Sequence, residues 1–203
     1  MQQTKIILYL CIILLGFIFN FISCIKLNTK LNKEYFFYSY IIFIISFFFG
    51  CKLFHIILNF DFTYNITILF TGYSFLGGLI LSIISLQLFS KVVKHNLLKI
   101  YLPSLILLYS ILKISCFIIG CCKGINNIPI QLIESLINII IYFIIIYKFK
   151  NKLVSYSLIL FSITRLIVSF IRIYPNIFSF IISQIICIVL IIYGIKYKNT
   201  IDQ

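Results

Sequence analysis

Apolar residues dominate the chain in seven long runs, which polar segments containing Lys, Asn, Pro or Gly separate. The runs cover residues 6–25, 35–60, 66–89, 97–119, 129–147, 153–172 and 174–195. A helix that crosses a bilayer needs roughly 20 apolar residues, and each run is long enough. None alternates like a strand, and in lipid the backbone must satisfy its own hydrogen bonds. We therefore predict an all-α membrane protein, a single multi-pass domain over residues 1–203 that forms a bundle of seven transmembrane helices.

The composition supports a membrane protein and excludes a soluble globule. Hydrophobic residues make up 63% of the chain and charged residues 10%, with a mean hydropathy of +1.17. Too few polar residues remain to cover a water-exposed surface. A formal net charge of +13 would suggest nucleic acid for a soluble protein, but these cations form short clusters between apolar runs. Such clusters are typical of loops that lie against anionic lipid.

The cations also alternate between successive connections, and this alternation predicts the orientation of the bundle. One set of connections holds eleven lysines: Lys26, Lys30, Lys33, Lys91, Lys94, Lys99, Lys148, Lys150, Lys152, Lys196 and Lys198. The opposite side holds three cations, Lys5, Lys123 and Arg172, and one of its connections carries Asp61 without a cation. Cytoplasmic loops carry the excess of Lys and Arg. The N-terminus is therefore predicted outside and the C-terminus in the cytoplasm.

The first run also resembles a signal peptide, because Phe21-Ile22-Ser23-Cys24 looks like a poor lipoprotein cleavage box. Cleavage there would place Lys26 and its neighbouring lysines outside. That placement contradicts the charge alternation of every later loop. We therefore expect the first run to remain as an uncleaved helix.

Five ionisable residues lie inside the predicted helices, at Lys52, His55, Lys113, Glu134 and Arg165. Each costs at least ~2.5–3.5 kcal/mol inside a span, so each requires a partner or a purpose. With the predicted orientation, all five fall in the outer half of the membrane and outline an outward-facing polar cavity. One interpretation is an ion pair that only locks the bundle. The other follows from three cations against one carboxylate, an excess that favours an anion such as a phospholipid phosphate.

The seven cysteines fall into two groups. Four of them, Cys11, Cys24, Cys51 and Cys187, lie in apolar runs and are expected to be small core residues. The other three, Cys116, Cys121 and Cys122, lie at the outer end of the fourth run, where Gly120 and Gly124 allow a tight turn. This spacing is a poor zinc site, and we predict no metal or cofactor. A disulfide, packed thiols and a reactive thiol beside Lys123 all remain open.

Several motifs, in their order and spacing, resemble those of prolipoprotein diacylglyceryl transferases. Residues 50–55 read GCKLFH and are similar to the family's G-A-[RK]-L-x-[HY], and residues 77–80 read GGLI and are similar to G-G-L-I-G. Residues 113–122 read KISCFIIGCC and resemble R-I-G-C-F-x-x-G-C-C. Residues 129–134 read PIQLIE beside P-x-Q-L-Y-E, and residues 165–172 read RLIVSFIR beside R-F-x-V-E-F-x-R. Ser183 and Gln184 stand where the family has a serine near G-Q.

The resemblance implies an enzyme of the bacterial cell membrane that moves diacylglycerol from phosphatidylglycerol to the lipobox cysteine of an exported prolipoprotein. It implies catalytic roles for Lys113, Arg165 and His55, with His55 as proton acceptor. The substrate-binding residues expected are Lys52, Gly77, Gly78, Gln131, Glu134 and Arg172. No nucleic acid partner is expected, and the protein is expected to act as a monomer.

Three departures from the family pattern support a rival interpretation. Lys113 replaces the signature arginine, Ser169 replaces a glutamate, and Leu76 replaces the histidine before the paired glycines. Lysine keeps the charge but lacks the two-pronged guanidinium. In the rival interpretation, the chain is an inactive member that binds phospholipid or a membrane partner.

Overall fold

The computed structural model describes residues 2–28, 31–59, 73–121, 124–174 and 176–201. Seven long helices run through these residues: α1 (Gln2–Leu27), α2 (Lys33–Asn59), α4 (Phe75–Val93), α5 (Leu98–Ile119), α6 (Ile130–Lys148), α7 (Leu153–Ser169) and α8 (Ile177–Ile201). Two single-turn 3-10 helices, η1 (Ile125–Asn127) and η2 (Lys150–Lys152), precede α6 and α7. In the described part of the chain, seven helices are long and apolar enough to cross a membrane, and no strand forms. The prediction of a seven-helix membrane protein is confirmed.

Helix bounds differ from the prediction most clearly for three helices, and the last of them, predicted over 174–195, is α8 and runs from Ile177 to Ile201. The third predicted helix was expected from residue 66, whereas Tyr73 and Ser74 are not helical and α4 begins at Phe75. The sixth was expected to reach residue 172, whereas α7 ends at Ser169. There the backbone turns to meet the α5–α6 connection, because the carbonyl of Ile171 accepts the amide of Ile125 at 2.9 Å. Predictions on residues 60 and 66–72, and on Lys30, Asp61, Cys122 and Lys123, lie outside the described residues.

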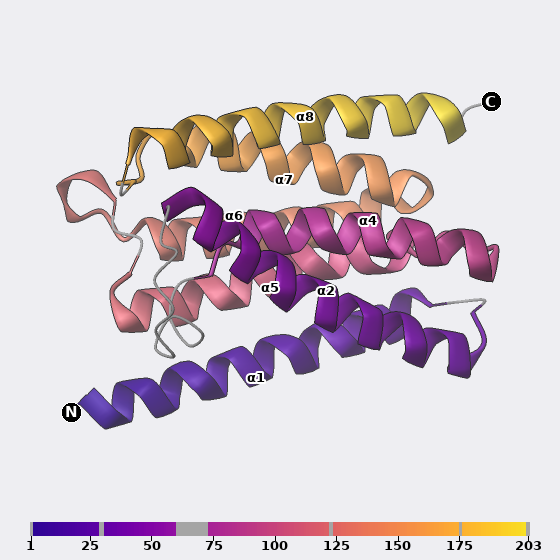
Figure 1. Cartoon of the computed structure of the whole chain (residues 1–203), viewed down its shortest axis with the longest axis horizontal. Coiled ribbons are helices and arrows are strands. Elements are labelled where there is room, and N and C mark those ends of the chain that lie inside the picture. Colours follow the sequence, from indigo (N-terminus) through magenta and orange to yellow (C-terminus); the bar gives the residue numbers. More distant parts are fainter. Residues whose placement is uncertain (1, 29–30, 60–72, 122–123, 175, 202–203) are drawn as a thin grey trace. The chain divides into compact units, whose positions relative to one another are not determined.

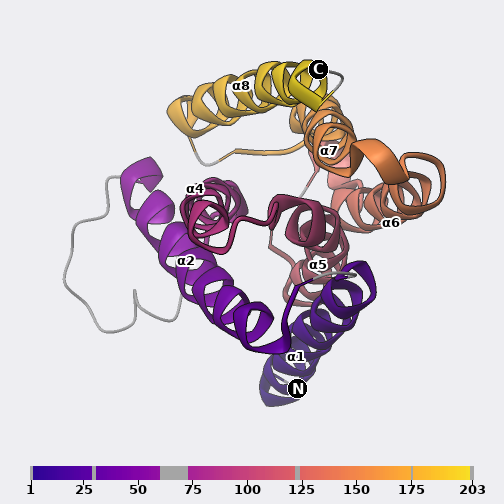
Figure 2. The same ribbon diagram turned by 90° about the vertical axis from the view of Figure 1, so that its right-hand side faces the viewer.

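The chain forms two compact units, Met1–Leu27 with Lys99–Gln203, and Asn28–Leu98. We call them unit 1 and unit 2. The prediction of one domain over the whole chain stays a prediction. In unit 1, α6, α7 and α8 follow one another and pack side by side (Figures 1 and 2).

Helix α1 joins unit 1 through buried hydroxyl groups. Ser23 Oγ lies 2.9 Å from Ser104 Oγ of α5 and 2.8 Å from the Tyr142 hydroxyl of α6. One turn earlier, Asn20 is fully buried on the same face, and neither atom of its amide group has a hydrogen-bond partner among the described residues. Hydroxyl contacts of this kind hold helices together in lipid, where apolar burial supplies little force between them.

Unit 2 depends on glycine where α2 and α4 meet. A Cβ atom on Gly77 would lie 2.2 Å from Phe54 Cβ and 2.3 Å from the carbonyl oxygen of Gly50. Only hydrogen fits there, so the two backbones approach closely. About two helical turns further along α4, Ser85 Oγ donates a 2.9 Å hydrogen bond to Ser46 Oγ of α2. The small-residue pattern of this segment thus packs a helix pair.

Many of the large apolar side chains point outward, as expected for a protein whose solvent is lipid. Three of the four cysteines predicted to be core residues, Cys24, Cys51 and Cys187, are buried. The prediction for Cys11 is wrong, because Cys11 is exposed on α1. A thiol is apolar enough to face lipid, so its place in an apolar run could not distinguish the two environments.

Candidate functional site

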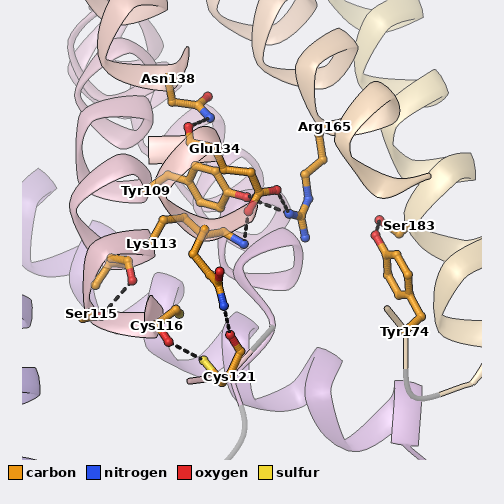
Figure 3. A network of polar contacts seen from close by, with 12 residues as sticks. Tyr109, Lys113, Ser115, Cys116, Cys121, Glu134, Asn138, Arg165, Tyr174 and Ser183 are labelled. Carbon is orange, nitrogen blue, oxygen red and sulfur yellow. Dashed lines mark hydrogen bonds and ion pairs between the residues drawn. The ribbon is translucent and has the colours of Figure 1, made fainter. Parts of the chain in front are cut away.

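The centre of unit 1 holds a carboxylate between two cations from neighbouring helices (Figure 3). Glu134 of α6 forms an ion pair through Oε2 with Lys113 Nζ of α5. Its other oxygen, Oε1, accepts a 2.7 Å hydrogen bond from Arg165 Nη1 of α7. Three helices thus meet at one carboxylate, and the predicted convergence of Lys113, Glu134 and Arg165 is present in the structure.

Tyr109 completes this cluster, one helical turn before Lys113 on α5. Its hydroxyl accepts a 2.6 Å hydrogen bond from Arg165 Nη1 and donates a 3.1 Å hydrogen bond to Glu134 Oε1. Lys113 Nζ lies 5.1 Å from the centre of the tyrosine ring, a cation–π distance. We call Tyr109, Lys113, Glu134 and Arg165 the charge cluster.

The charge cluster is buried and carries one positive charge in excess. Glu134 is 1% exposed and Lys113 5% exposed, while the Arg165 side chain is 9% exposed. Two cations face one carboxylate, which leaves a formal charge of +1 in surroundings of low dielectric constant. Arg165 Nε has no hydrogen-bond partner among the described residues. An anion with several oxygen atoms would supply both the missing charge and the missing acceptor.

The glycine-cysteine turn after α5 is a Schellman C-cap. Gly120 adopts a φ of 78°, its amide donates to Phe117, and the amide of Cys121 donates to Cys116 at 3.1 Å. The Cys121 thiol lies 3.5 Å from the Cys116 carbonyl oxygen. Because Cys122 and Lys123 lie outside the described residues, the disulfide, the packed thiols and the reactive thiol all stay open. Among the described residues, no group of three His, Cys, Asp or Glu side chains is placed to hold a metal ion.

Gln131 connects this turn to the charge cluster. The residue lies on α6 one turn before Glu134, and its Nε2 donates to the carbonyl oxygen of Cys121. Gln131 is 4% exposed, and its side-chain amide donates this hydrogen bond within the protein rather than to solvent. This contact anchors the start of α6 to the end of α5 beside Glu134.

A cleft of about 410 Å³ opens where α7 passes into α8. It is lined by Ser169, Phe170, Arg172, Tyr174, Asn176, Ile177 and Phe180. The Arg172 guanidinium carbon lies 5.5 Å from the centre of the Tyr174 ring. Ser169 accepts a hydrogen bond from Gln184 of α8, so a neutral pair occupies the position where the resembling family carries a glutamate. This cleft contains Arg172, which the sequence analysis assigned to the outer side and to substrate binding.

The remaining predicted site residues belong to unit 2. Lys52 Nζ lies 5.2 Å from the centre of the Tyr73 ring, and His55 is half-buried on the same helix. The Cα atoms of Gly77 and Gly78 face α2, which gives both glycines a packing role. That these residues act in one site with the charge cluster stays a prediction. A contact between the substrate and Gly77 or Gly78 also stays a prediction.

The sequence interpretation missed the part that Tyr109 plays. Helical spacing places Tyr109 on one face with Lys113 and Cys116, but it indicates no contact with Arg165. Its spacing of four residues from Lys113 was the available signal, since residues four apart lie on one helix face.

Comparison with known proteins agrees with the motifs. A family model described as prolipoprotein diacylglyceryl transferase matches residues 1–198, almost the whole chain. No curated protein matches the chain.

Proposed function

Because the chain belongs to the prolipoprotein diacylglyceryl transferase family, whose model matches residues 1–198, we propose that it uses phosphatidylglycerol as its lipid donor. Diacylglycerol passes to the lipobox cysteine thiol of an exported prolipoprotein, and a thioether forms. The protein is a multi-pass membrane protein, and we place it in the bacterial cell membrane as a monomer with its charge cluster in the outer half. There a membrane lipid and an exported precursor meet.

The reaction is a displacement at a glycerol carbon. The cysteine thiol loses its proton and its sulfur attacks the carbon, so a carbon–sulfur bond forms while the carbon–oxygen bond to phosphate breaks. Glycerol-1-phosphate leaves with the electron pair of the broken bond. Negative charge therefore builds on the departing phosphate, where fixed cations stabilise it most.

One observation carries the proposal: the charge cluster is buried and holds a formal charge of +1. Lys113 and Arg165 neutralise the phosphate, and Glu134 holds both cations in position. Gln131 orients the start of α6 through the Cys121 carbonyl oxygen. An arginine offers a phosphate two parallel hydrogen bonds, whereas Lys113 offers a point charge.

Five further residues complete the proposal. Arg172 and Lys52 bind the lipid phosphate, and Gly77 and Gly78 support substrate binding by holding α4 close against α2. His55 accepts the thiol proton, because imidazole is the side chain whose ordinary pKa suits proton transfer near neutrality.

A second candidate function is phospholipid binding without turnover. The observation that favours it is the pairing of Ser169 with Gln184, which replaces a carboxylate by a neutral hydrogen bond. Leu76, in place of the family's histidine, is buried and apolar.

Turnover in a defined membrane tests the proposal. The purified protein in phosphatidylglycerol nanodiscs is incubated with a lipobox peptide, and mass spectrometry follows the lipidated thioether. We expect product from the native chain and a loss of at least about a hundredfold for Arg165→Gln. Lys148→Gln, at the opposite end of unit 1, serves as the matched control and should retain activity. Phosphatidylglycerol binding without product would select the second candidate, and absence of both would reject the two functions together.

A further inference from the structure

We propose that Tyr109 is a positioning residue that aims one edge of the Arg165 guanidinium at the anion. The inference rests on the proposed function of the charge cluster and goes beyond it. It assigns a task to a residue that the family motifs quoted above do not contain. The task is to occupy Nη1 of Arg165, so that the opposite edge of the guanidinium faces the ligand.

The hydrogen bonds that Arg165 makes with described residues all start from one nitrogen, Nη1, while its guanidinium carbon lies 5.6 Å from the centre of the Tyr109 ring. Nη1 donates to the Tyr109 hydroxyl at 2.6 Å and to Glu134 Oε1 at 2.7 Å. Nε has no partner among the described residues. The two donors on the far edge, Nε and Nη2, point the same way and match two oxygen atoms of a phosphate. Within the charge cluster, Nη1 is therefore occupied by Tyr109 and Glu134, and the edge formed by Nε and Nη2 faces the ligand.

Tyr109 is the residue able to impose this choice. Its hydroxyl lies between the two charged partners, since it accepts from Arg165 and donates to Glu134 at 3.1 Å. Both of its functions as donor and acceptor are used, which fixes the orientation of the hydroxyl. Without this hydroxyl, Glu134 Oε1 would be the remaining acceptor for Nη1. The guanidinium could then rotate toward Glu134 Oε2, the oxygen atom that pairs with Lys113.

A purely structural role for Tyr109 is the alternative. The ring is buried and meets Phe161 edge-on at 5.1 Å between centroids, which is good aromatic packing. Phenylalanine keeps this packing and the cation–π contact with Lys113, and it removes only the hydroxyl. Tyr109→Phe therefore separates the positioning role from the packing role.

Arginine-selective ¹⁵N spectroscopy reads the guanidinium directly, because the chain contains only two arginines, Arg165 and Arg172. Arg172→Lys assigns the signals by removing one set. In the native chain we expect separate, slowly exchanging Nη signals for Arg165 and a shift of its Nε–H signal when glycerol-1-phosphate is added. In Tyr109→Phe the Nη signals should merge, and about tenfold more glycerol-1-phosphate should be needed for the same shift.

Kinetics supply the second readout. Tyr109→Phe should lower kcat for the lipobox peptide by roughly tenfold or more, since a hydrogen bond to a charged group is lost, while KM for phosphatidylglycerol changes less. Tyr101→Phe is the matched control, because Tyr101 is a fully buried tyrosine on the same helix. The control should leave kcat and the Arg165 signals unchanged.

The outcomes separate this inference from the proposed function. The native chain could show no turnover and still give slowly exchanging Arg165 Nη signals that merge in Tyr109→Phe. That result would reject the proposed transferase activity and retain the positioning role. Normal kcat and an unchanged Arg165 spectrum in Tyr109→Phe would overturn the positioning role alone. Rapid rotation of the Arg165 guanidinium in the native chain would also overturn it, whether or not the variant folds.

Discussion

Replacing Glu134 by glutamine tests the electrostatics of the charge cluster. The carboxylate is 1% exposed and pairs with Lys113 and Arg165. An amide removes the negative charge and turns an NH₂ group toward one of the two cations. Breaking a buried ion pair from one side costs about 3–5 kcal/mol, because an uncompensated charge remains in the interior. For a chain of this size, each kcal/mol lowers Tm by about 2–4 °C, so Glu134→Gln should lower Tm by about 6–20 °C.

The assay is thermal unfolding in detergent, followed by circular dichroism, with a second substitution to close a thermodynamic cycle. Lys113→Met removes one of the two cations, so the variant that combines it with Glu134→Gln relieves the repulsion. We expect the double variant to exceed Glu134→Gln in stability by at least about 1 kcal/mol. Ser135→Ala, a buried neighbour on α6, is the control and should cost less than about 1 kcal/mol. A Tm for Glu134→Gln equal to that of the control, or strictly additive effects, would refute the reasoning.

Three further outcomes follow from other contacts. Gly77→Ala should destabilise unit 2 and lower its yield in membranes, because its Cβ would lie 2.2 Å from Phe54 Cβ, and a protease-protection assay would detect the loss. Asn20→Leu should raise Tm, since the buried amide of Asn20 has no partner among the described residues and costs about 1–3 kcal/mol; an unchanged or lower Tm would indicate a bound water. Lys113→Arg should retain transfer activity, whereas Lys113→Gln should lower kcat by at least about a hundredfold, and equal rates for the two variants would argue against a charge requirement at this position.

The number and type of helices were predictable because each run is far longer than a soluble core segment and lipid permits few alternatives. The convergence of Lys113, Glu134 and Arg165 was predictable for a related reason. A bilayer assigns every helical residue a depth, and loop charge assigns each helix a direction. Each of the two cations is then attracted strongly to the carboxylate at the same depth, because the low dielectric constant of the membrane interior screens charges weakly.

The detailed contacts were not predictable, because they depend on how each helix is rotated about its axis. Helical spacing places Tyr109 on the face of Lys113 but does not reveal that its hydroxyl reaches Arg165 of α7. The end of α7 depends on a hydrogen bond between Ile125 and Ile171, which join parts of the chain 46 residues apart. Cys11 shows the same limit, since an apolar run has no polar face from which to infer burial.

The close meeting of α2 and α4 also determines which parts of this sequence can vary. Across most of the outer surface, one apolar side chain can replace another, because lipid adapts to either shape. At Gly77 the neighbour is the carbonyl oxygen of Gly50, a backbone atom that remains whichever side chain is substituted there. In a library of random variants, the lipid-facing positions should therefore tolerate wide exchange among Ile, Leu, Val and Phe. Tolerance should fall to almost nothing at these few glycines, which would identify the helix crossing without any measurement of structure.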